Sequence, residues 1–441
     1  MTLSFSEKDK RYTWHPYTQH AVERDAEVIV KAKGASLFRE NGDEILDMIS
    51  SWWTCTHGHS HPELNKVLRE QSETLEHVMF AGFTHPKAVN LAEKLAQLLP
   101  GELNRVFFTD NGSSSVEVAL KLAYQYWRNQ GKTKRTKFIA FERAYHGDTF
   151  GSMSVGKSCG FFHMFEDLLF DVATIPFPET WIDDPDVAEK EKQALLAFED
   201  LLKAHKSETA AIIVEPLMQG AGGIRTCRPS FMKELVDTAH RHNILVIFDE
   251  IAVGFGRLGS LFACQKIGVV PDLICLSKGL TAGYMPMAVT VATDTIFEAF
   301  YDSDFKKAFI HGHTFTANPL ACALALRGLE LFDEENTLQR IKEIEDQHLG
   351  QAQTLKDHPL IEKIRVMGTC LAFNLKDEVG NYKTTGTEIL RDWFLKTGFN
   401  IRPIGPAVYI MPPFCITDAQ LTRGYNALHE GLTLLETKKA A

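Results

Sequence analysis

Short apolar runs that alternate with helical segments constrain the fold of this chain more than any other feature. Strands separated by helices pair in parallel, because each helix returns the chain to the edge where the previous strand began. The pattern therefore predicts an α/β fold built on a mostly parallel, doubly wound sheet. The predicted strands are Arg105–Thr109, Lys137–Phe141, Ala211–Glu215, Ile244–Phe248 and Leu273–Leu276.

A helix is expected directly after the first of these runs. Apolar residues at positions 116, 119, 120, 123 and 127 recur at helical spacing. A turn of Asp110, Asn111 and Gly112 separates this helix from the strand. Ser114 and Glu117 have the spacing of a capping box, so we expect them to cap the start of the helix.

Residues that can do chemistry follow each predicted strand at its carboxyl end. In a doubly wound sheet these ends meet at one edge, where ligands bind. We therefore expect a glycine turn, an aromatic side chain, several acids and a lysine to converge on one pocket. The segments concerned are Gly112-Ser113, Tyr145-His146-Gly147-Asp148, Glu215, Asp249-Glu250 and Ser277-Lys278-Gly279.

Composition and charge argue against several classes of protein. The 441 residues carry a formal net charge of -10 without a basic stripe, so no nucleic-acid partner is expected. No stretch approaches the roughly 18 apolar residues of a membrane span, and the first residues lack the apolar core of a signal peptide. The eight cysteines form no CxxC pair, which indicates reduced core thiols in a cytoplasmic protein. The length favours two lobes.

Lys278 stands between an apolar strand and a glycine-rich loop. Partial burial at this position would favour the neutral amine, which can attack a carbonyl carbon. Taken alone, a solvated lysine at a strand end is the commoner structure. A catalytic role for Lys278 is therefore indicated only together with the residues that we expect beside it.

Asp249 follows five apolar residues and would be expensive to bury without a cationic partner. A pyridinium nitrogen is such a partner, although a magnesium ion or a structural salt bridge would also serve. Gly112 and Ser113 at a helix N-terminus form either an anion site or an ordinary capped turn. Tyr145 can stack on a flat ring or pack as a loop aromatic.

Three motifs match known patterns but lack the required context. Residues 151–158 (GSMSVGKS) fit the P-loop pattern of ATPases, yet a P-loop follows a strand directly and opens a helix. Residues 254–259 (GFGRLG) spell a dinucleotide motif beside two carboxylates, which a pyrophosphate would avoid. Residues 55–61 (CTHGHSH) alternate in a way that does not match paired metal ligands. We expect loop packing there and no metal site, and keep an ATPase as a remote alternative.

Together these residues resemble the class III (ω-amino-group) aminotransferases of fold type I, and the resemblance covers nearly the whole chain. It rests on residues 249–257 (DEIAVGFGR), on Lys278 placed 29 residues after Asp249, and on residues 144–147 (AYHG) and 314–319 (TFTANP). The resemblance implies a large domain that binds pyridoxal 5'-phosphate.

The same resemblance implies the division of the chain and its assembly. Residues 61–330 would form the large domain. Residues 1–60 and 331–441 would together form the small α+β domain. The family further implies a homodimer whose active sites take residues from both subunits.

The resemblance also implies roles in holding the cofactor. Lys278 would carry it as a Schiff base and shuttle protons, Asp249 would pair with the pyridine nitrogen, and Tyr145 would stack on the ring. His313 departs from the proline that the best-known relatives have at this position. The phosphate would be held by Gly112 and Ser113, joined by His313 and Thr314 from the other subunit.

Four further segments are similar to one branch of this class: residues 14–18 (WHPYT), 50–53 (SSWW), 77–80 (HVMF) and 401–403 (IRP). That branch aminates 8-amino-7-oxononanoate in biotin biosynthesis, usually with S-adenosylmethionine as the amino donor. By this resemblance Arg402 would grip the carboxylate of the keto acid. The substrate pocket would be lined by Tyr17, Trp52, Tyr145, Lys278 and Gly312, with Asp148 and Glu215 as nearby acids.

Two alternatives within the fold stay open at this point. The chain could be another class III enzyme that acts on a diamine or an ω-amino acid. It could also be a non-catalytic cofactor-binding protein, although the presence of Lys278, Asp249 and Tyr145 argues against that.

Overall fold

A seven-stranded sheet forms the centre of the computed structural model, which describes residues 3–380 and 382–440. Its strand order is β4-β12-β11-β10-β7-β5-β6. Neighbouring strands pair in parallel except that β12 runs antiparallel to both β11 and β4. The strands are β4 (Leu103–Thr109), β5 (Lys137–Phe141), β6 (Val172–Ile175), β7 (Thr209–Val214), β10 (Leu245–Asp249), β11 (Leu273–Leu276) and β12 (Ala288–Thr293).

The predicted α/β fold with a mostly parallel sheet is confirmed. The five predicted strands become β4, β5, β7, β10 and β11. The bounds of β5 and β11 match the prediction, and those of the other three shift by one or two residues. The sequence pattern missed β6 and β12. The antiparallel β12 follows β11 through a glycine-rich loop without an intervening α-helix, so the alternation of strand and helix did not reveal it.

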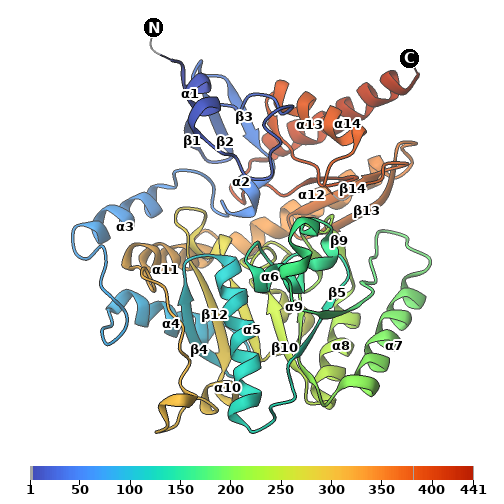
Figure 1. The fold of residues 1–441 in the computed structure, drawn as a ribbon. Helices are drawn as coiled ribbons and strands as arrows, with labels where there is room; N and C mark the ends of the chain where they lie inside the picture. Colours follow the sequence, from blue (N-terminus) through green and yellow to red (C-terminus); the bar gives the residue numbers. More distant parts are fainter. Residues whose placement is uncertain (1–2, 381, 441) are drawn as a thin grey trace.

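Helices pack on both faces of this sheet (Figure 1). Alternate residues of β10 enter separate cores, because successive side chains of a strand point to opposite faces. Leu245 and Ile247 pack with α5 (Gly112–Asn129), whereas Val246 and Phe248 pack with α8 (Pro229–Arg241). The other elements of this part are α3 (Pro62–Ser72), α4 (Pro86–Leu98), α6 (Phe150–Val155), α7 (Val187–His205), β8 (Met218–Gln219), β9 (Arg225–Thr226), α9 (Ala263–Ile267), α10 (Asp294–Glu298), α11 (Pro319–Glu334), η1 (Lys157–Cys159), η2 (His163–Leu168), η3 (Lys278–Thr281) and η4 (Phe305–Lys307).

The predicted capping box on α5 is wrong. The N-cap residue is Asn111, whose side-chain oxygen accepts a hydrogen bond from the backbone N–H of Ser114 at 3.0 Å. Glu117 instead accepts hydrogen bonds from Thr149 Oγ1 at 2.6 Å and from the backbone N–H of Gly151 at 2.7 Å. Glu117 therefore ties α5 to the start of α6 rather than to its own N-terminus.

The two ends of the chain share a second core, seen as neighbouring blue and red elements in Figure 1. Leu46 and Met48 pack there with Ile344, Phe373 and Leu428. The domain boundaries given above stay a prediction, but this core unites the same two ends. Its elements are α1 (Phe5–Tyr12), β1 (Ile29–Lys33), β2 (Ser36–Arg39), β3 (Glu44–Asp47), α12 (Thr337–Leu355), β13 (Ile361–Met367), β14 (Cys370–Leu375), α13 (Thr385–Lys396), β15 (Phe399–Asn400), β16 (Ala407–Ile410) and α14 (Asp418–Ala440).

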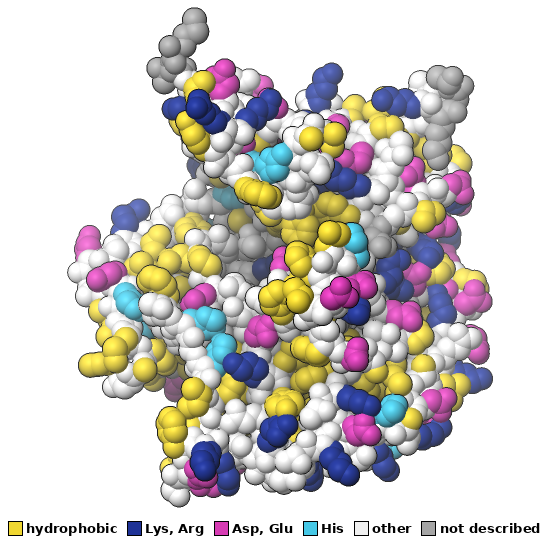
Figure 2. All heavy atoms as spheres, viewed as in Figure 1, with side chains coloured by type: hydrophobic (Ala, Val, Ile, Leu, Met, Phe, Trp, Pro, Cys, Tyr) yellow, Lys and Arg dark blue, Asp and Glu magenta, His cyan; other side chains and the backbone are white. Residues whose placement is uncertain are grey.

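The structure can be compared with what composition predicted about the cysteines, membrane-spanning segments and surface charge. All eight thiols are free, and seven are buried as expected, but Cys415 is exposed and is not a core residue. In the described part of the chain, no helix is long and apolar enough to cross a membrane. Figure 2 shows acidic and basic side chains interspersed on the visible face.

Candidate active site

A cavity of about 300 Å³ lies at the carboxyl ends of the parallel strands. This volume is at the lower end of the range for small-molecule sites, roughly 300–1,000 Å³. The structure thus brings together residues from all five of the segments singled out from the sequence. The lining residues are Trp53, Asn111, Gly112, Ser113, Tyr145, His146, Gly147, Glu215, Asp249, Ile251, Ala252, Ser277 and Lys278.

Lys278 begins η3, separated from the end of β11 only by Ser277, and has a left-handed φ of 47°. A non-glycine residue in this region costs roughly 1–2 kcal/mol, and such strain often accompanies functional positions. Its Nζ lies 4.7 Å from the centroid of the Trp53 ring. Burial lowers the pKa of the Lys278 amine, and the opposing attraction of Asp249 and Glu215 does not cancel this effect. The amine is therefore more easily held in its neutral, nucleophilic form.

Asp249 ends β10 with only 4% of its surface exposed. Its Oδ2 lies 2.7 Å from His146 Nδ1, and its Oδ1 accepts a hydrogen bond from the backbone N–H of Ile251 at 3.1 Å. The Nε2 atom of His146 is buried without a hydrogen-bond partner among the described residues. A buried carboxylate that a histidine orients in this way can accept a further hydrogen bond from a protonated ring nitrogen.

The N-terminus of α5 also lines the cavity. Gly112 and Ser113 occupy the first helical turn, where backbone N–H groups lack partners within the helix. Gly147 has a φ of 121°, and a Cβ atom there would lie 2.1 Å from Ser113 Oγ. The loop after β5 can therefore approach this helix start only because residue 147 is glycine. Free N–H groups and the helix dipole together suit an anion.

Glu215 connects the ends of β7 and β5. Its carboxylate accepts hydrogen bonds from the backbone N–H groups of Tyr145 at 3.0 Å and Gly220 at 2.8 Å. Burial raises the pKa of Glu215 to about 7. The residue therefore fixes the backbone of Tyr145 beside the cavity.

The lining groups fit a flat, phosphorylated pyridine aldehyde. The amine of Lys278, whose pKa is lowered by burial, suits the aldehyde, the carboxylate of Asp249 suits a ring N–H, and the start of α5 suits the phosphate. The rings of Trp53 and Tyr145 can cover the apolar faces of such a molecule.

Tyr17, Trp52 and Arg402 form a second group that joins the cavity through Tyr145. The hydroxyl of Tyr17 lies 3.2 Å from that of Tyr145, and both donate hydrogen bonds to Asp148. The Tyr17 ring centroid lies 5.9 Å from that of Trp52. The guanidinium carbon of Arg402 lies 5.3 Å from the centroid of the Trp52 ring. A continuous aromatic wall thus leads from the lysine to an arginine.

A left-handed turn places the two tryptophans. The four residues of α2 (Ser50–Trp53) have φ values of 51°, 45°, 70° and 71°, at a cost of roughly 1–2 kcal/mol each. The turn is held by Ser51 Oγ, which donates to Asp47 Oδ2 at 2.8 Å, and by Ser50 Oγ, which donates to the carbonyl of Met411 at 2.8 Å. As a result Trp52 contacts Arg402, while its neighbour in sequence contacts Lys278.

Gly312, His313 and Thr314 do not line the cavity of their own chain. They belong to the loop between η4 and α11, where Gly312 and Thr314 are exposed. His313 Nδ1 lies 3.5 Å from Asp110 Oδ2, next to the turn that precedes α5. Their predicted contact with phosphate would require a second subunit.

The sequence did not predict several residues that the structure brings to the site. Trp53, His146, Phe161 and Tyr382 were not assigned a role, although Trp53 and His146 belong to quoted motifs. The hydrophobic pattern of a strand or helix predicts which face of the element a side chain lies on, but it does not reveal a left-handed turn. Tyr382 lies in a polar loop 20 residues before Arg402 and carries no sequence pattern of its own.

The competing motifs do not form the sites they resemble. Gly151 lies inside α6 and Lys157 lies in η1, so the P-loop arrangement of strand, loop and helix is not formed and the ATPase alternative is wrong. The histidines of residues 55–61 diverge: His57 Nε2 lies 3.0 Å from the carbonyl oxygen of Gly328, whereas His59 contacts Asp47. Within the described ranges, no three His, Cys, Asp or Glu side chains are placed to hold a metal ion.

Comparison with known proteins gives consistent matches over the whole chain. The family described as aminotransferase class-III matches residues 17–432. The adenosylmethionine-8-amino-7-oxononanoate aminotransferase of Synechococcus elongatus is 44% identical over 417 residues, which covers 95% of this chain and 97% of that protein. The crystal structure of the enzyme of that name from Methanocaldococcus jannaschii has a TM-score of 0.89 at 31% identity and covers 97% of this chain and 98% of its own. An ω-transaminase from Pseudomonas jessenii in complex with PMP has a TM-score of 0.91 at 27% identity, with 98% of each chain covered.

Proposed function

The chain belongs to the class III aminotransferase family, and we propose that it transfers an amino group to 8-amino-7-oxononanoate in biotin biosynthesis. The product would be 7,8-diaminononanoate, and S-adenosylmethionine would be the amino donor. The name shared by relatives from several bacteria supports both substrates. Transfer in two half-reactions at one site predicts ping-pong kinetics.

Enzymes of this class depend on pyridoxal phosphate. When bound, this cofactor supplies an electron sink for the carbanion that forms at the substrate carbon. We assign Lys278 as the residue that holds the cofactor aldehyde and, once free, moves a proton through its Nζ. Asp249 would keep the proton on the ring nitrogen, and Tyr145 would cover the ring.

We further propose that the enzyme is a homodimer with shared sites. Gly112 and Ser113 would hold the phosphate together with the partner's His313 and the partner's Thr314. The exposure of Thr314 and of its neighbour Phe315, at 59%, supports a loop that reaches another subunit.

Co-expression tests this arrangement. Lys278→Ala and a His313→Ala/Thr314→Ala double variant should each be inactive alone. Mixed dimers should regain activity, since one of their two sites would contain only unchanged residues. Mixtures that stay inactive although mixed dimers form would contradict shared sites.

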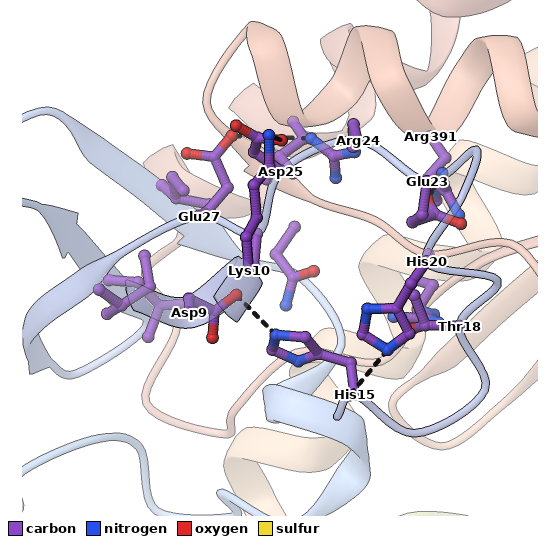
Figure 3. Close-up of a pocket in the computed structure, with 17 residues that line it drawn as sticks. Asp9, Lys10, His15, Thr18, His20, Glu23, Arg24, Asp25, Glu27 and Arg391 are labelled. Carbon is purple, nitrogen blue, oxygen red and sulfur yellow. Dashed lines mark hydrogen bonds and ion pairs between the residues drawn. The ribbon is translucent and has the colours of Figure 1, made fainter. Parts of the chain in front are cut away.

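The observation that carries the substrate assignment is that the charge of Arg402 faces no carboxylate within the described residues. Arg402 lines a second cavity of about 330 Å³ between the N-terminal segment and α13. The other lysine and arginine side chains of this cavity, Lys10, Arg24 and Arg391, are labelled in Figure 3, and each has a carboxylate partner. These pairs are Lys10–Asp25 at 2.6 Å, Arg24–Asp392 at 3.3 Å and Arg391–Glu23 at 2.5 Å.

Arg402 has no acidic partner among the residues that the structure describes. Its guanidinium lies over Trp52, at the far end of the aromatic wall that begins beside Lys278. An arginine suits a carboxylate, and an aromatic wall suits the aliphatic chain that joins the carboxylate to the reacting ketone. Tyr17, Trp52, Tyr145 and the partner's Gly312 would line the path between the two ends.

A donor screen with purified enzyme and 8-amino-7-oxononanoate tests the proposal. Formation of the diamine with S-adenosylmethionine as the donor is the expected result. Formation with lysine alone would keep the acceptor assignment and overturn the assignment of the donor. If the keto acid is not aminated by any donor, while a diamine or ω-amino acid is turned over, the enzyme is a different class III aminotransferase. The similarity to ω-transaminases makes this the second candidate.

A cytoplasmic location, in keeping with the free thiols, is part of the proposal.

A further inference from the structure

Tyr382 is placed directly against Arg402. It lies in the loop between β14 and α13, and its hydroxyl oxygen accepts a hydrogen bond from Arg402 Nη2 at 2.6 Å. The carbonyl of Tyr382 accepts a hydrogen bond from the backbone N–H of Gly405 at 2.9 Å. This second bond ties the loop to the chain just after Arg402.

Aromatic contacts fix the orientation of the Tyr382 ring. Its centroid lies 5.8 Å from that of Tyr17 and 5.7 Å from that of Phe161, with an interplanar angle of 81° to Phe161. Edge-to-face pairs at this separation are attractive. Tyr382 therefore packs against Tyr17 and Phe161 with its hydroxyl beside the guanidinium of Arg402.

The hydrogen-bonding capacity of the pair leaves one donor free. A guanidinium only donates, so the hydroxyl of Tyr382 must be the acceptor in its bond with Arg402. The hydroxyl hydrogen is then left to donate, and the described residues supply no other partner for it. A carboxylate beside Arg402 would receive hydrogen bonds both from the guanidinium and from this hydroxyl.

We propose that Tyr382 determines specificity by binding the distal carboxylate of the keto acid together with Arg402. The inference rests on the proposed function, because it takes 8-amino-7-oxononanoate as the acceptor. It assigns the recognition of the acid to two residues from separate loops. Tyr382 would add a directed hydrogen bond to the charge that Arg402 provides.

The test compares the enzyme with and without the Tyr382 hydroxyl on an acceptor with and without the carboxylate. Tyr382→Phe keeps the ring and its packing. The acceptors are 8-amino-7-oxononanoate and an amino ketone of the same length that ends in a methyl group. Tyr382→Phe should lower kcat/KM for the acid by roughly 10- to 100-fold, the loss expected for one hydrogen bond to a charged group. It should leave kcat/KM for the methyl-ended ketone nearly unchanged, which a merely structural role would not do.

Two controls separate failure of this inference from failure of the proposed function. Tyr301→Phe changes an exposed tyrosine, 75% accessible, and should affect neither acceptor. Arg402→Gln should remove most of the preference for the acid. If Arg402→Gln removes this preference but Tyr382→Phe does not, or if Tyr382→Phe slows both acceptors equally, the role of Tyr382 is overturned while the proposed function stands. If the unchanged enzyme does not aminate the acid, the proposed function fails first.

Discussion

Lys278 and Arg402 lie at the two ends of the site, and the chain builds these ends in different ways. The lysine end is assembled from the carboxyl ends of neighbouring strands, and its acid, Asp249, is 4% exposed. The arginine end is assembled from segments that contain Tyr17, Trp52 and Tyr382. Tyr17 and Tyr382 are half-buried, and Trp52 is 38% exposed. The comparison indicates that the sheet fixes the chemistry, whereas loops from both ends of the chain select the substrate.

Lys278→Ala should produce the largest loss and should affect both half-reactions. Without the amine, neither the hold on the cofactor nor the proton transfer is possible, so kcat should fall by about 10³-fold or more. Single-turnover rates with donor and with acceptor, alongside circular dichroism to verify folding, measure the effect. Lys157→Ala, in the segment that resembles a P-loop, serves as the matched control and should retain full activity.

Arg402→Ala should affect the keto acid and the amino donor to different extents. Loss of a charged partner for the carboxylate should lower kcat/KM for the keto acid by about 100-fold, with a far smaller effect on the donor. Steady-state kinetics with each substrate varied in turn measure the ratio. Equal losses for both substrates would contradict the carboxylate role and remove the distinction between a chemical end and a selective end.

Much of the lysine end could be predicted from the sequence, and the physical reason is regular geometry. Five strands with helical connections must align their carboxyl ends, so Gly112, Tyr145, Glu215, Asp249 and Lys278 meet without any knowledge of side-chain contacts. The antiparallel strand β12 was not predicted, because no α-helix connects it to β11, but it does not change where the carboxyl ends of the parallel strands lie.

The arginine end could be predicted only in part, through resemblance to a family. The left-handed turn at Ser50–Trp53 depends on the contacts of Asp47, and no local pattern encodes four such residues in succession. The contact of Tyr382 with Arg402 depends on how two loops meet in space. Such contacts are set by tertiary packing, which single-sequence patterns do not report.

Asp47→Asn tests whether the turn that joins the two ends depends on a buried ion pair. Asp47 is fully buried and contacts Ser51 Oγ, His59 Nε2 at 2.8 Å and Asn400 Nδ2 at 2.9 Å. Breaking a buried pair by removing one charge costs about 3–5 kcal/mol. We therefore expect the free energy of unfolding, measured with denaturant, to fall by about 3 kcal/mol.

The exposed residue Asp43, also close to β3, provides the matched control. Asp43→Asn should change the free energy of unfolding by no more than about 0.5 kcal/mol. A similar decrease in the free energy of unfolding in both variants would show that the buried ion pair of Asp47 does not stabilise the turn.

The last prediction concerns the pH dependence of the same ion pair. Burial alone would lower the pKa of His59, but its hydrogen bonds to Asp47 and Cys55 raise it to about 10. A raised folded-state pKa gives stability that is complete below the unfolded value, about 6.5, and is lost as pH rises through about 10. The thermal midpoint should therefore fall as the pH rises from about 6.5 to about 10.

His59→Gln should weaken this dependence, since glutamine carries no proton to lose. Thermal unfolding of the two proteins, followed across the same buffers, measures the difference. A midpoint that falls equally in both would assign the pH dependence to other groups.

Reduction with borohydride tests most directly whether Lys278 holds the cofactor. The purified protein, saturated with pyridoxal phosphate, is reduced, digested and analysed by mass spectrometry for the lysine that bears the cofactor. The account predicts a single modified peptide that contains Lys278 and loss of the label in Lys278→Ala. A label on another lysine, or a protein that binds no pyridoxal phosphate, would contradict it.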